Sequence, residues 1–171
     1  MEVLEVIKAR RSVRAYRDVP VEADKLEQIL TAVNQAPSAG NLQAYEVYVV
    51  ERPELRKGLR QAAFDQEFLD QAPIVLVFCA HAARSVGKYG RRGEELYCLQ
   101  DATIACTFAM LAATALGLST VWVGAFDETE VSRILGLTPN HRPIAMLPVG
   151  YSADHPRNRG RRSLSDLLHR L

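Results

Sequence analysis

Residues 102–126 carry no charged side chain, and this run limits the possible folds more than any other stretch of the chain. Such a run either crosses a membrane or lies in the core of a soluble protein. Residues 102–115 precede a break at Leu116-Gly117-Leu118-Ser119, and alanine is frequent among them. Because a membrane span needs about 20 predominantly apolar residues, the run predicts a buried helix, a turn and a buried strand, and no membrane segment.

Composition predicts one soluble domain that spans residues 1–171. Of the 171 residues, 48% are hydrophobic and 24% are charged, which is ordinary for a globular protein. The formal net charge of +1 argues against broad electrostatic capture of nucleic acid or of an anionic membrane. Residues 1–5 lack a basic segment with an apolar stretch behind it, so we expect no secretory signal and a cytoplasmic protein.

The cysteines and histidines predict neither a disulfide framework nor a metal site. Cys79, Cys98 and Cys106 are odd in number, form no C-x-x-C pair and have no histidine at ligand spacing. We therefore expect inert thiols in the core. The four histidines are scattered along the sequence and are predicted to be surface or structural residues: His81, His141, His155 and His169.

Periodicity and turn residues predict alternating helices and strands in one α/β or α+β domain. Leu26, Ile29, Leu30 and Val33 have the spacing of an amphipathic helix, expected over 22–35. Residues 82–93 are rich in glycine and arginine and are expected to form a loop before the longest helix, over 94–115. The other expected helices cover 2–8, 53–63, 127–136 and 164–171, and the expected strands cover 46–51, 74–78, 120–125 and 144–149.

The two ends of the chain are strongly basic. Residues 1–17 and 155–171 together hold 10 of the 21 basic residues, and the first group contains Arg10-Arg11-Ser12-Val13-Arg14. The arginine fork makes two parallel bonds to phosphate or carboxylate oxygens. The distribution predicts that the termini converge on one compact anion, whereas the alternative is a solvated charge run.

A second candidate site is the loop Ala36-Pro37-Ser38-Ala39-Gly40-Asn41-Leu42-Gln43. Its hydroxyl and amide groups can hydrogen-bond a ligand, and its small residues let a planar group approach the backbone. The glycines of 87–93 match neither nucleotide-binding spacing, and no hydrolytic motif is present. The sequence therefore offers binding groups without an evident nucleophile.

Taken in order, these motifs resemble the nitroreductase family of flavin enzymes over nearly the whole chain. The arginine cluster, the loop at 36–43 and the closing Arg159-Gly160-Arg161-Arg162 are the most specific parts. The supporting motifs are Gln100-Asp101, Ala115-Leu116-Gly117-Leu118, Trp122-Val123-Gly124-Ala125-Phe126 and Leu147-Pro148-Val149-Gly150-Tyr151.

The resemblance implies an α+β three-layer sandwich with a largely antiparallel central sheet flanked by helices. It also implies an intertwined homodimer with two FMN sites at the subunit interface, with NAD(P)H as reductant. The implied reaction is ping-pong: hydride passes from NAD(P)H to flavin N5, and then to a nitroaromatic, quinone or similar small acceptor. No catalytic side chain is expected, because the cofactor carries the redox chemistry.

The resemblance also assigns the binding residues. The phosphate and ribityl groups fall to Arg10, Arg11, Ser12 and Arg14, with Arg159 and Arg161 closing the phosphate site. The flavin ring would be lined from the second subunit by Pro37, Ser38, Ala39 and Asn41, with Gln43 in the same loop. Backbone of Gly124 and Ala125 would face N5, and Gln66 and Gln100 are assigned to the ring.

Two alternatives remain open at this stage. The same fold and flavin could carry out reductive dehalogenation or flavin fragmentation. The basic ends could also belong to a non-enzymatic nucleotide-binding module. The chain lacks the longer inserts of larger family members, and Asp65 stands where they often place an amide, so the acceptor is the least determined part of the prediction.

Overall fold

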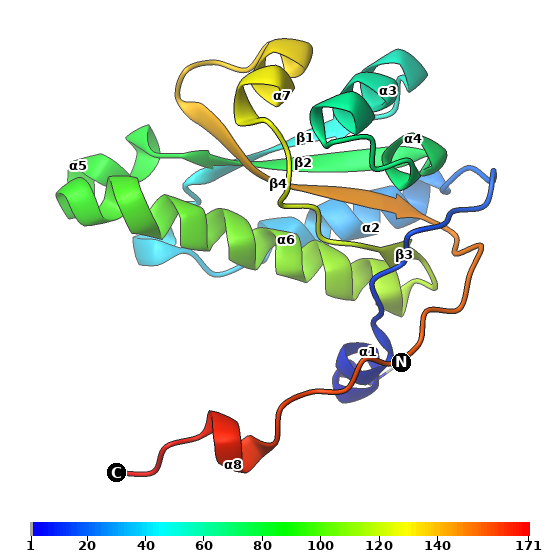
Figure 1. The fold of residues 1–171 in the computed structure, drawn as a ribbon. Coiled ribbons are helices and arrows are strands. Elements are labelled where there is room, and N and C mark those ends of the chain that lie inside the picture. Colours follow the sequence, from blue (N-terminus) through cyan, green and yellow to red (C-terminus); the bar gives the residue numbers. More distant parts are fainter. Residues whose placement is uncertain (1) are drawn as a thin grey trace.

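The computed structural model describes residues 2–171, which form a four-stranded antiparallel sheet between two layers of helices (Figure 1). The strand order is β1-β2-β4-β3. The strands are β1 (Tyr45–Val50), β2 (Ile74–His81), β3 (Ser119–Thr120) and β4 (His141–Gly150). The predicted α+β sandwich with a largely antiparallel sheet is confirmed, since the one parallel contact in the described chain is an isolated bridge between Ser12 and Thr120.

Three helices cover one face of the sheet: α3 (Pro53–Ala62), α4 (Phe68–Gln71) and α7 (Glu128–Leu135). The other face is covered by α2 (Ala23–Asn34) and α6 (Cys98–Ala115). β2 is buried along nearly its whole length, as its continuous β-branched and aromatic sequence predicts. Alternate residues of β2 enter the two cores, with Val77 on the α3 side and Leu76 on the α6 side.

The local signals at helix ends act as the sequence predicts. Pro53 opens α3, where its missing N–H costs no hydrogen bond. The Asp127 carboxylate accepts from the backbone N–H groups of Thr129 and Glu130 and so caps α7. Gly136 ends α7 with a positive φ of 62°. These signals are short-range, and the helix positions that depend on them are confirmed.

The uncharged run forms the core helix α6, as predicted. Ala102, Ala105, Ala109 and Ala113 have no exposed surface, which lets the helix backbone approach the sheet closely. By length and composition alone, the helical stretch Ala83–Ala115 is apolar enough to cross a membrane. Its C-terminal part packs instead against β2 and β4 as the buried helix of a soluble fold (Figure 1).

The expectation of a loop over 82–93 is wrong. These residues form α5 (Ala83–Arg92), followed by a π-helical turn, η2 (Gly93–Tyr97), that leads into α6. Only Gly90 leaves helical geometry, with φ 55° and ψ −143°. Gly93 serves close packing, because a Cβ there would lie 2.7 Å from the Ser85 carbonyl oxygen. The glycines therefore mark a kink and a tight helix contact.

Two other expected elements are shorter than the sequence predicts. The strand expected over 120–125 is reduced to β3 and one bridge between Val123 and Met146. Val121 and Val123 are buried all the same, so their apolar pattern reports burial without strand pairing. The helix expected over 164–171 is only α8 (Leu164–Leu167), on an arm that extends away from the sandwich near α1 (Val3–Ala9) (Figure 1).

The three cysteines are free and buried, as predicted. Burial raises the pKa of Cys79 to about 12 and also raises the pKa of Cys106 and Cys98. Each thiol thus stays protonated at neutral pH and behaves as a small core residue.

Candidate functional site

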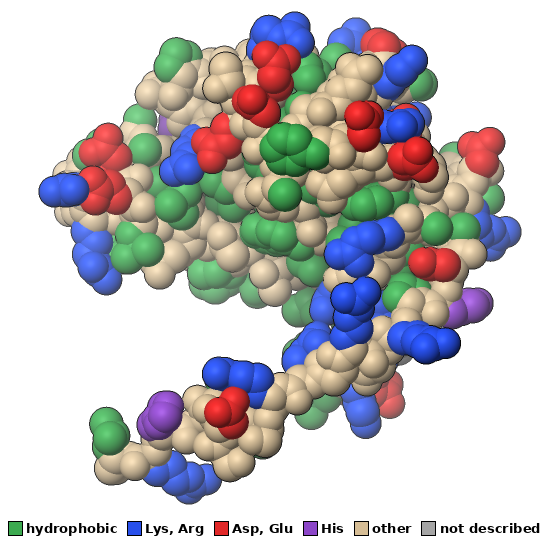
Figure 2. All heavy atoms as spheres, viewed as in Figure 1, with side chains coloured by type: hydrophobic (Ala, Val, Ile, Leu, Met, Phe, Trp, Pro, Cys, Tyr) green, Lys and Arg blue, Asp and Glu red, His purple; other side chains and the backbone are tan. Residues whose placement is uncertain are grey.

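The arginines of the two chain ends line one cavity of about 660 Å³. Figure 2 shows Lys and Arg side chains gathered where the C-terminal arm leaves the body of the molecule. The predicted convergence of the termini is therefore present within a single chain. The lining residues are Arg10, Arg11, Ser12, Arg14, Asp154, Pro156, Arg157, Asn158, Arg159 and Arg161.

Backbone pairing holds the basic segment between two other strands of chain. On one side, the Val13 N–H donates to the Thr120 carbonyl at 3.1 Å. On the other side, the Ala153 N–H donates to the Ala15 carbonyl at 2.9 Å. The buried Tyr16 hydroxyl donates to the carbonyls of Val13 and Pro148 and ties the segment to β4. The arginines thus project from a fixed backbone.

Most of the charge in this cavity has no protein counter-ion. Arg11 donates to the carbonyls of Lys8, Ala9 and Arg10 and so caps α1. Among the arginines of the two chain ends in residues 2–171, Arg162 is the one that pairs with a carboxylate, that of Asp166 at 3.5 Å. Arg162 does not line the cavity, so this ion pair does not offset the charge there. Burial, and then the positive charges of Arg161 and Arg11, lower the pKa of Arg10. A dianionic phosphate fits this cavity because it would relieve that repulsion.

Residues 37–39 of the 37–43 loop line a different cavity, of about 600 Å³, together with the start of α6, whereas Asn41 and Gln43 are not part of its lining. Pro37, Ser38 and Ala39 face Gln100 there, with Tyr97, Leu99, Asp101, Thr103 and Ile104 completing the lining. The Asp101 carboxylate, only 2% exposed, accepts from the Ala39 N–H at 2.9 Å and from the Ala44 N–H at 3.2 Å. Asp101 therefore clamps both ends of the loop.

The interior of this loop is also fixed by short-range bonds. Gly40, Asn41 and Gln43 have φ values of 58°, 59° and 43°, which is the left-handed region. The Gln43 N–H donates to Ser38 Oγ at 3.0 Å, and the Gln43 amide donates to the side-chain oxygen of Asn41 at 3.0 Å. Tyr89 and Lys88 of α5 reach over Gly40, where a Cβ would contact their terminal atoms.

The structure places Gln66 beside the Gly124–Ala125 segment. The Gln66 amide donates to the Ala125 carbonyl at 3.1 Å and to the Ala63 carbonyl at 3.0 Å. Both amide hydrogens therefore have backbone acceptors, which holds Gln66 and Ala125 together at the edge of the α3 side. Gln100 lies elsewhere, in the cavity of the 37–43 loop.

The arginine cavity and the 37–43 loop, the two halves of the predicted flavin site, lie at opposite ends of α6. Thr114, near its C-terminal end, lines a small cavity with Arg10 and Arg11, whereas Asp101 near its N-terminal end holds the 37–43 loop. These two positions are thirteen residues apart, or about 20 Å along a helix with a rise of about 1.5 Å per residue. One chain thus brings together the arginines of its two ends, and separately residues 37–39 with Gln100, but it does not bring these two groups together. Gln66 and Ala125 form a third group on the α3 side.

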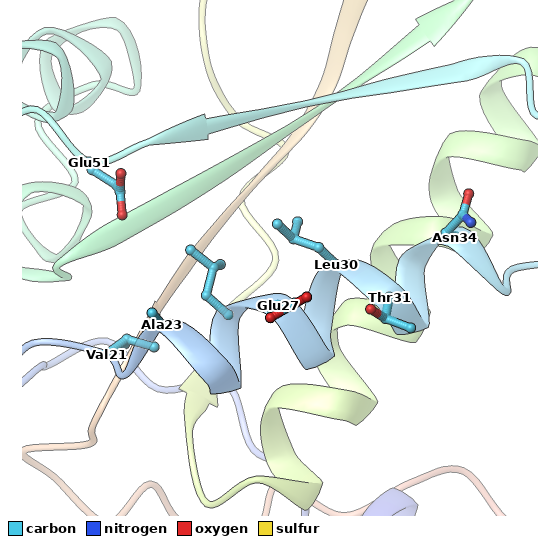
Figure 3. A pocket seen from close by; sticks show the side chains of 8 residues that line it. Val21, Ala23, Glu27, Leu30, Thr31, Asn34 and Glu51 are labelled. Atoms are coloured by element: carbon cyan, nitrogen blue, oxygen red, sulfur yellow. The ribbon is translucent and has the colours of Figure 1, made fainter.

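A further groove of about 510 Å³ runs along α2 (Figure 3). Val21, Leu26 and Leu30 supply its apolar surface, and Glu27 and Glu51 supply carboxylates. It contains no arginine or lysine, so it does not suit a phosphate. Of these three cavities, the arginine cavity is the one whose charge suits an anion.

The model of the nitroreductase family matches residues 7–67 and 61–151 of this chain. The chain belongs to the nitroreductase family. A Bacillus subtilis protein named FMN reductase [NAD(P)H] is 34% identical over 170 residues, which cover 90% of this chain and 67% of the relative. The family predicted from the motifs is confirmed.

Solved structures of the nitroreductase fold agree. The B. megaterium protein NfrA2 superposes with a TM-score of 0.92 at 31% identity, covering 99% of this chain and 74% of that one. The Vibrio harveyi NADPH:FMN oxidoreductase, solved with NAD+, superposes with a TM-score of 0.90 at 26% identity. That match covers 98% of this chain and 76% of the Vibrio chain.

Sequence reasoning missed the role of Asp101 in this nitroreductase. It also missed α5, whose Lys88 and Tyr89 cover the loop. The sequence signal for Asp101 is its position directly before the uncharged run, since a carboxylate at the start of an apolar helix needs hydrogen-bond donors when buried. The helix α5 was missed because its glycines are typical of a loop.

Proposed function

We propose that this nitroreductase is an FMN-dependent NAD(P)H oxidoreductase that holds the flavin phosphate among the arginines of its two ends. One observation carries the proposal: arginines from both termini line one cavity. Asp154 lines it too, but no carboxylate in residues 2–171 lies within ion-pair distance of Arg10, Arg14, Arg159 or Arg161. Unpaired arginines in a fixed cradle are suited to a phosphate.

The named relatives support flavin as the cofactor and NAD(P)H as the reductant. When bound, FMN supplies the hydride chemistry between NAD(P)H and the acceptor. The protein itself then has to bind the flavin, orient it and shield it from water. Arg10, Ser12 and Arg14 hold the phosphate and ribityl end, and Arg159 and Arg161 close over it, with Arg11 fixing the end of α1.

The flavin ring is held by other residues: the Gly124–Ala125 segment with Gln66, and the 37–43 loop with Gln100. Gly124 and Ala125 offer backbone next to Gln66, whose amide keeps the Ala125 carbonyl in place. Pro37, Ser38, Ala39, Asn41 and Gln43 give a stiff, small-residue surface that excludes water from a planar ring, with Gln100 beside it. A surface already fixed by its own hydrogen bonds orients a ligand with little loss of entropy.

The separation of the halves supports a homodimer, in which each site takes arginines from one subunit and the 37–43 loop from the other. Within one chain the halves are about 20 Å apart along α6. The extended C-terminal arm also exposes Leu164, Leu167 and Leu168, at 70%, 49% and 54%, and α1 exposes Val3 and Leu4. Apolar side chains on an arm away from the core are typical of a surface that a second subunit covers.

The proposed setting is the cytoplasm, with a small oxidised molecule such as a nitroaromatic or quinone as acceptor. The cysteines are all free thiols in the core, which is compatible with a reducing compartment. A parallel screen of nitroaromatic, quinone and halophenol acceptors separates reduction of nitro or quinone groups from dehalogenation.

The decisive experiment measures FMN affinity by quenching of flavin fluorescence. Each charge-assisted bond is worth about 1.5–3 kcal/mol, so Arg10→Ala with Arg14→Ala should weaken FMN binding by at least tenfold. The matched control, Arg52→Ala with Arg133→Ala, removes two exposed arginines elsewhere and should bind FMN like the wild type. Equal affinity of the two double variants would show that the cluster does not hold the phosphate.

The wild-type protein also has a direct test of the reaction class. Under anaerobic conditions, NADH or NADPH should bleach the visible absorption of the bound flavin. A yellow protein that neither donor bleaches would refute the oxidoreductase proposal while leaving flavin binding intact.

A further inference from the structure

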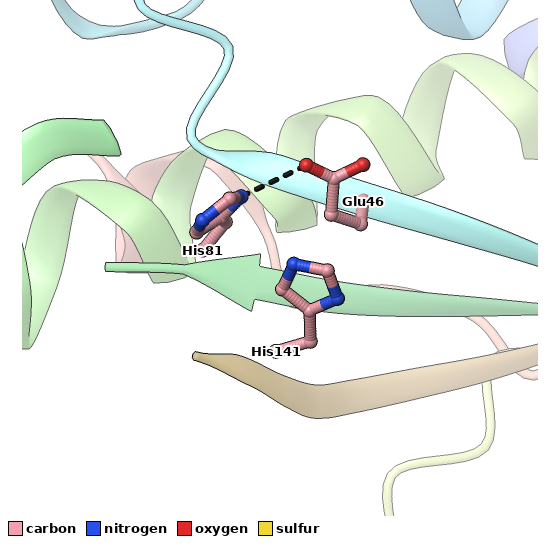
Figure 4. Close-up of side chains that lie close together, drawn as sticks. All are labelled: Glu46, His81 and His141. Atoms are coloured by element: carbon pink, nitrogen blue, oxygen red, sulfur yellow. Dashed lines mark hydrogen bonds and ion pairs between the residues drawn. The ribbon is translucent and has the colours of Figure 1, made fainter. Parts of the chain in front are cut away.

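Two histidines that are far apart in the sequence meet at one end of the sheet. His81, the last residue of β2, pairs directly with His141, the first residue of β4. Glu46 of β1 pairs with Cys79, two residues before His81, so its side chain is on the same face of the sheet. Figure 4 shows the three side chains converging from three adjacent strands. The wide spacing of His81 and His141 in the sequence gives no sign of this contact, which the β2–β4 register creates.

The ligand atoms of these side chains are already close. Glu46 Oε1 and His81 Nδ1 are 2.8 Å apart, and the two imidazole rings meet edge to face with centroids 4.6 Å apart. One ligand atom from each of the three side chains lies within 4.8 Å of the others. Zinc bonds of about 2.0–2.2 Å place tetrahedral ligands about 3.4 Å apart, so small side-chain rotations complete the geometry.

A hydrogen bond from a neighbour orients His141. The Tyr48 hydroxyl lies 2.6 Å from His141 Nδ1, and in Figure 4 the other ring nitrogen faces Glu46 and His81. When Nδ1–H donates to Tyr48, Nε2 has its lone pair free for a metal. Metal-binding histidines characteristically have such a partner on the second nitrogen, because it fixes the tautomer and the ring orientation.

The local charge and exposure also suit a cation. The adjacent Arg142 is paired with the Glu128 carboxylate at 2.9 Å through two of its nitrogens, so its charge is largely offset. The His81 side chain is 19% exposed and that of Glu46 is 38% exposed, so an ion can enter from solvent. Two imidazoles and one carboxylate are ligands that zinc accepts, with a fourth position for water.

We propose that Glu46, His81 and His141 bind one divalent metal ion of the zinc class, separate from the flavin site. The ion takes the place of the hydrogen bond between Glu46 and His81 and ties β1, β2 and β4 together. The backbone N–H of His81 donates to the Ala44 carbonyl at 2.9 Å, so this end of the sheet adjoins the end of the 37–43 loop. The site is a candidate for stabilising that region of the fold.

The test uses the untagged, FMN-loaded protein, dialysed against a chelator and then titrated with ZnCl₂ in a calorimeter. We expect one Zn²⁺ per chain and a higher unfolding temperature with Zn²⁺ present. Loss of a residue that merely orients a ligand costs about 10–100-fold in metal affinity, so His81→Ala and Glu46→Gln should each weaken binding by at least tenfold.

Glu46→Gln keeps a hydrogen-bonding partner for His81, so it separates loss of a ligand from loss of folding. Circular dichroism and FMN content of each variant provide the folding check. His169→Ala is the matched control, since it removes an exposed imidazole from the C-terminal arm and should bind Zn²⁺ like the wild type. The proposal is overturned if wild type shows no binding at excess Zn²⁺, or if Glu46→Gln and His169→Ala bind Zn²⁺ equally well.

Discussion

The 37–43 loop and the arginine cavity differ in how their polar groups are satisfied. In the loop, Asp101, Ser38 and Gln43 bond backbone and side-chain groups of the same chain. In the arginine cavity, burial and then the like charges of Arg161 and Arg11 lower the pKa of Arg10. One region is complete before a ligand arrives, whereas the other has one carboxylate, Asp154, among its arginines and, in the described chain, no ion pair to any of them. The difference indicates that the ring surface is preorganised and that the phosphate surface depends on its ligand.

The helix α6 accounts for the separation of these two regions. Asp101 holds the loop at one end, and Thr114 lies with Arg10 and Arg11 at the other end. A rigid helix cannot shorten that distance, so in the proposed function the two regions that hold one flavin come from two chains. This geometric requirement gives the strongest test of the comparison.

The largest expected effect is complementation between two defective chains. One chain carries Arg10→Ala with Arg14→Ala, and the other carries Asn41→Gly with Gln43→Gly, where glycine accepts the positive φ. Each variant alone should retain little FMN. In a mixed symmetric dimer one of the two sites is intact, so random assembly of equal amounts restores about a quarter of the sites.

Bound FMN per chain after co-expression of the two variants is the measured quantity. Separately purified variants, mixed without dissociation, are the control and should show no recovery. If co-expression also restores nothing, both halves act within one chain and the dimeric site model fails. Light scattering then gives the mass of the assembly directly.

The next largest effect tests how the loop is held. Asp101→Asn removes the charge and turns an NH₂ group toward a backbone N–H. A lost hydrogen bond to a charged group costs about 1.5–3 kcal/mol, so we expect a fall of about 2–3 kcal/mol in the free energy of unfolding. Urea denaturation measures it, with the exposed Asp18→Asn as control. Equal stability of the two variants would mean that the loop does not depend on Asp101.

Sequence reasoning succeeded where a feature is carried by local pattern or by total charge. The buried helix α6 follows from an uncharged run, and the helix expected over 127–136 is present as α7, with Asp127 as its cap. The convergence of the basic ends follows from charge, because ten basic residues at the two ends need a common counter-ion. Family membership followed from the order of several such motifs along the chain.

Sequence reasoning failed where the role of a residue depends on strand register or on a contact with a residue distant in the sequence. His81 and His141 are sixty residues apart, and only the β2–β4 pairing places them opposite each other. Gly93 looked like a loop residue because its contact with Ser85 cannot be seen in sequence. Val121 and Val123 have strand-like residue types but are buried with little pairing, since β-propensity reflects packing more than hydrogen bonding.

The smallest expected effect concerns the unpaired charge itself. Because burial and neighbouring arginines disfavour the charge of Arg10 in the folded chain, Arg10→Met should stabilise the flavin-free protein, while it weakens FMN binding. The gain should be about 0.2–1 kcal/mol, the range for exposed charge pairs. Salt screens such repulsion, so the gain should shrink at high ionic strength, as followed by urea denaturation at two salt concentrations.

Arg142→Met is the matched comparison, because this arginine has its carboxylate partner, Glu128, at 2.9 Å. Its replacement should lower the free energy of unfolding by a similar amount, so the two arginine variants should move stability in opposite directions. A loss of stability in both would mean that Arg10 has partners in the flavin-free protein and that the arginine cavity is as complete in itself as the 37–43 loop.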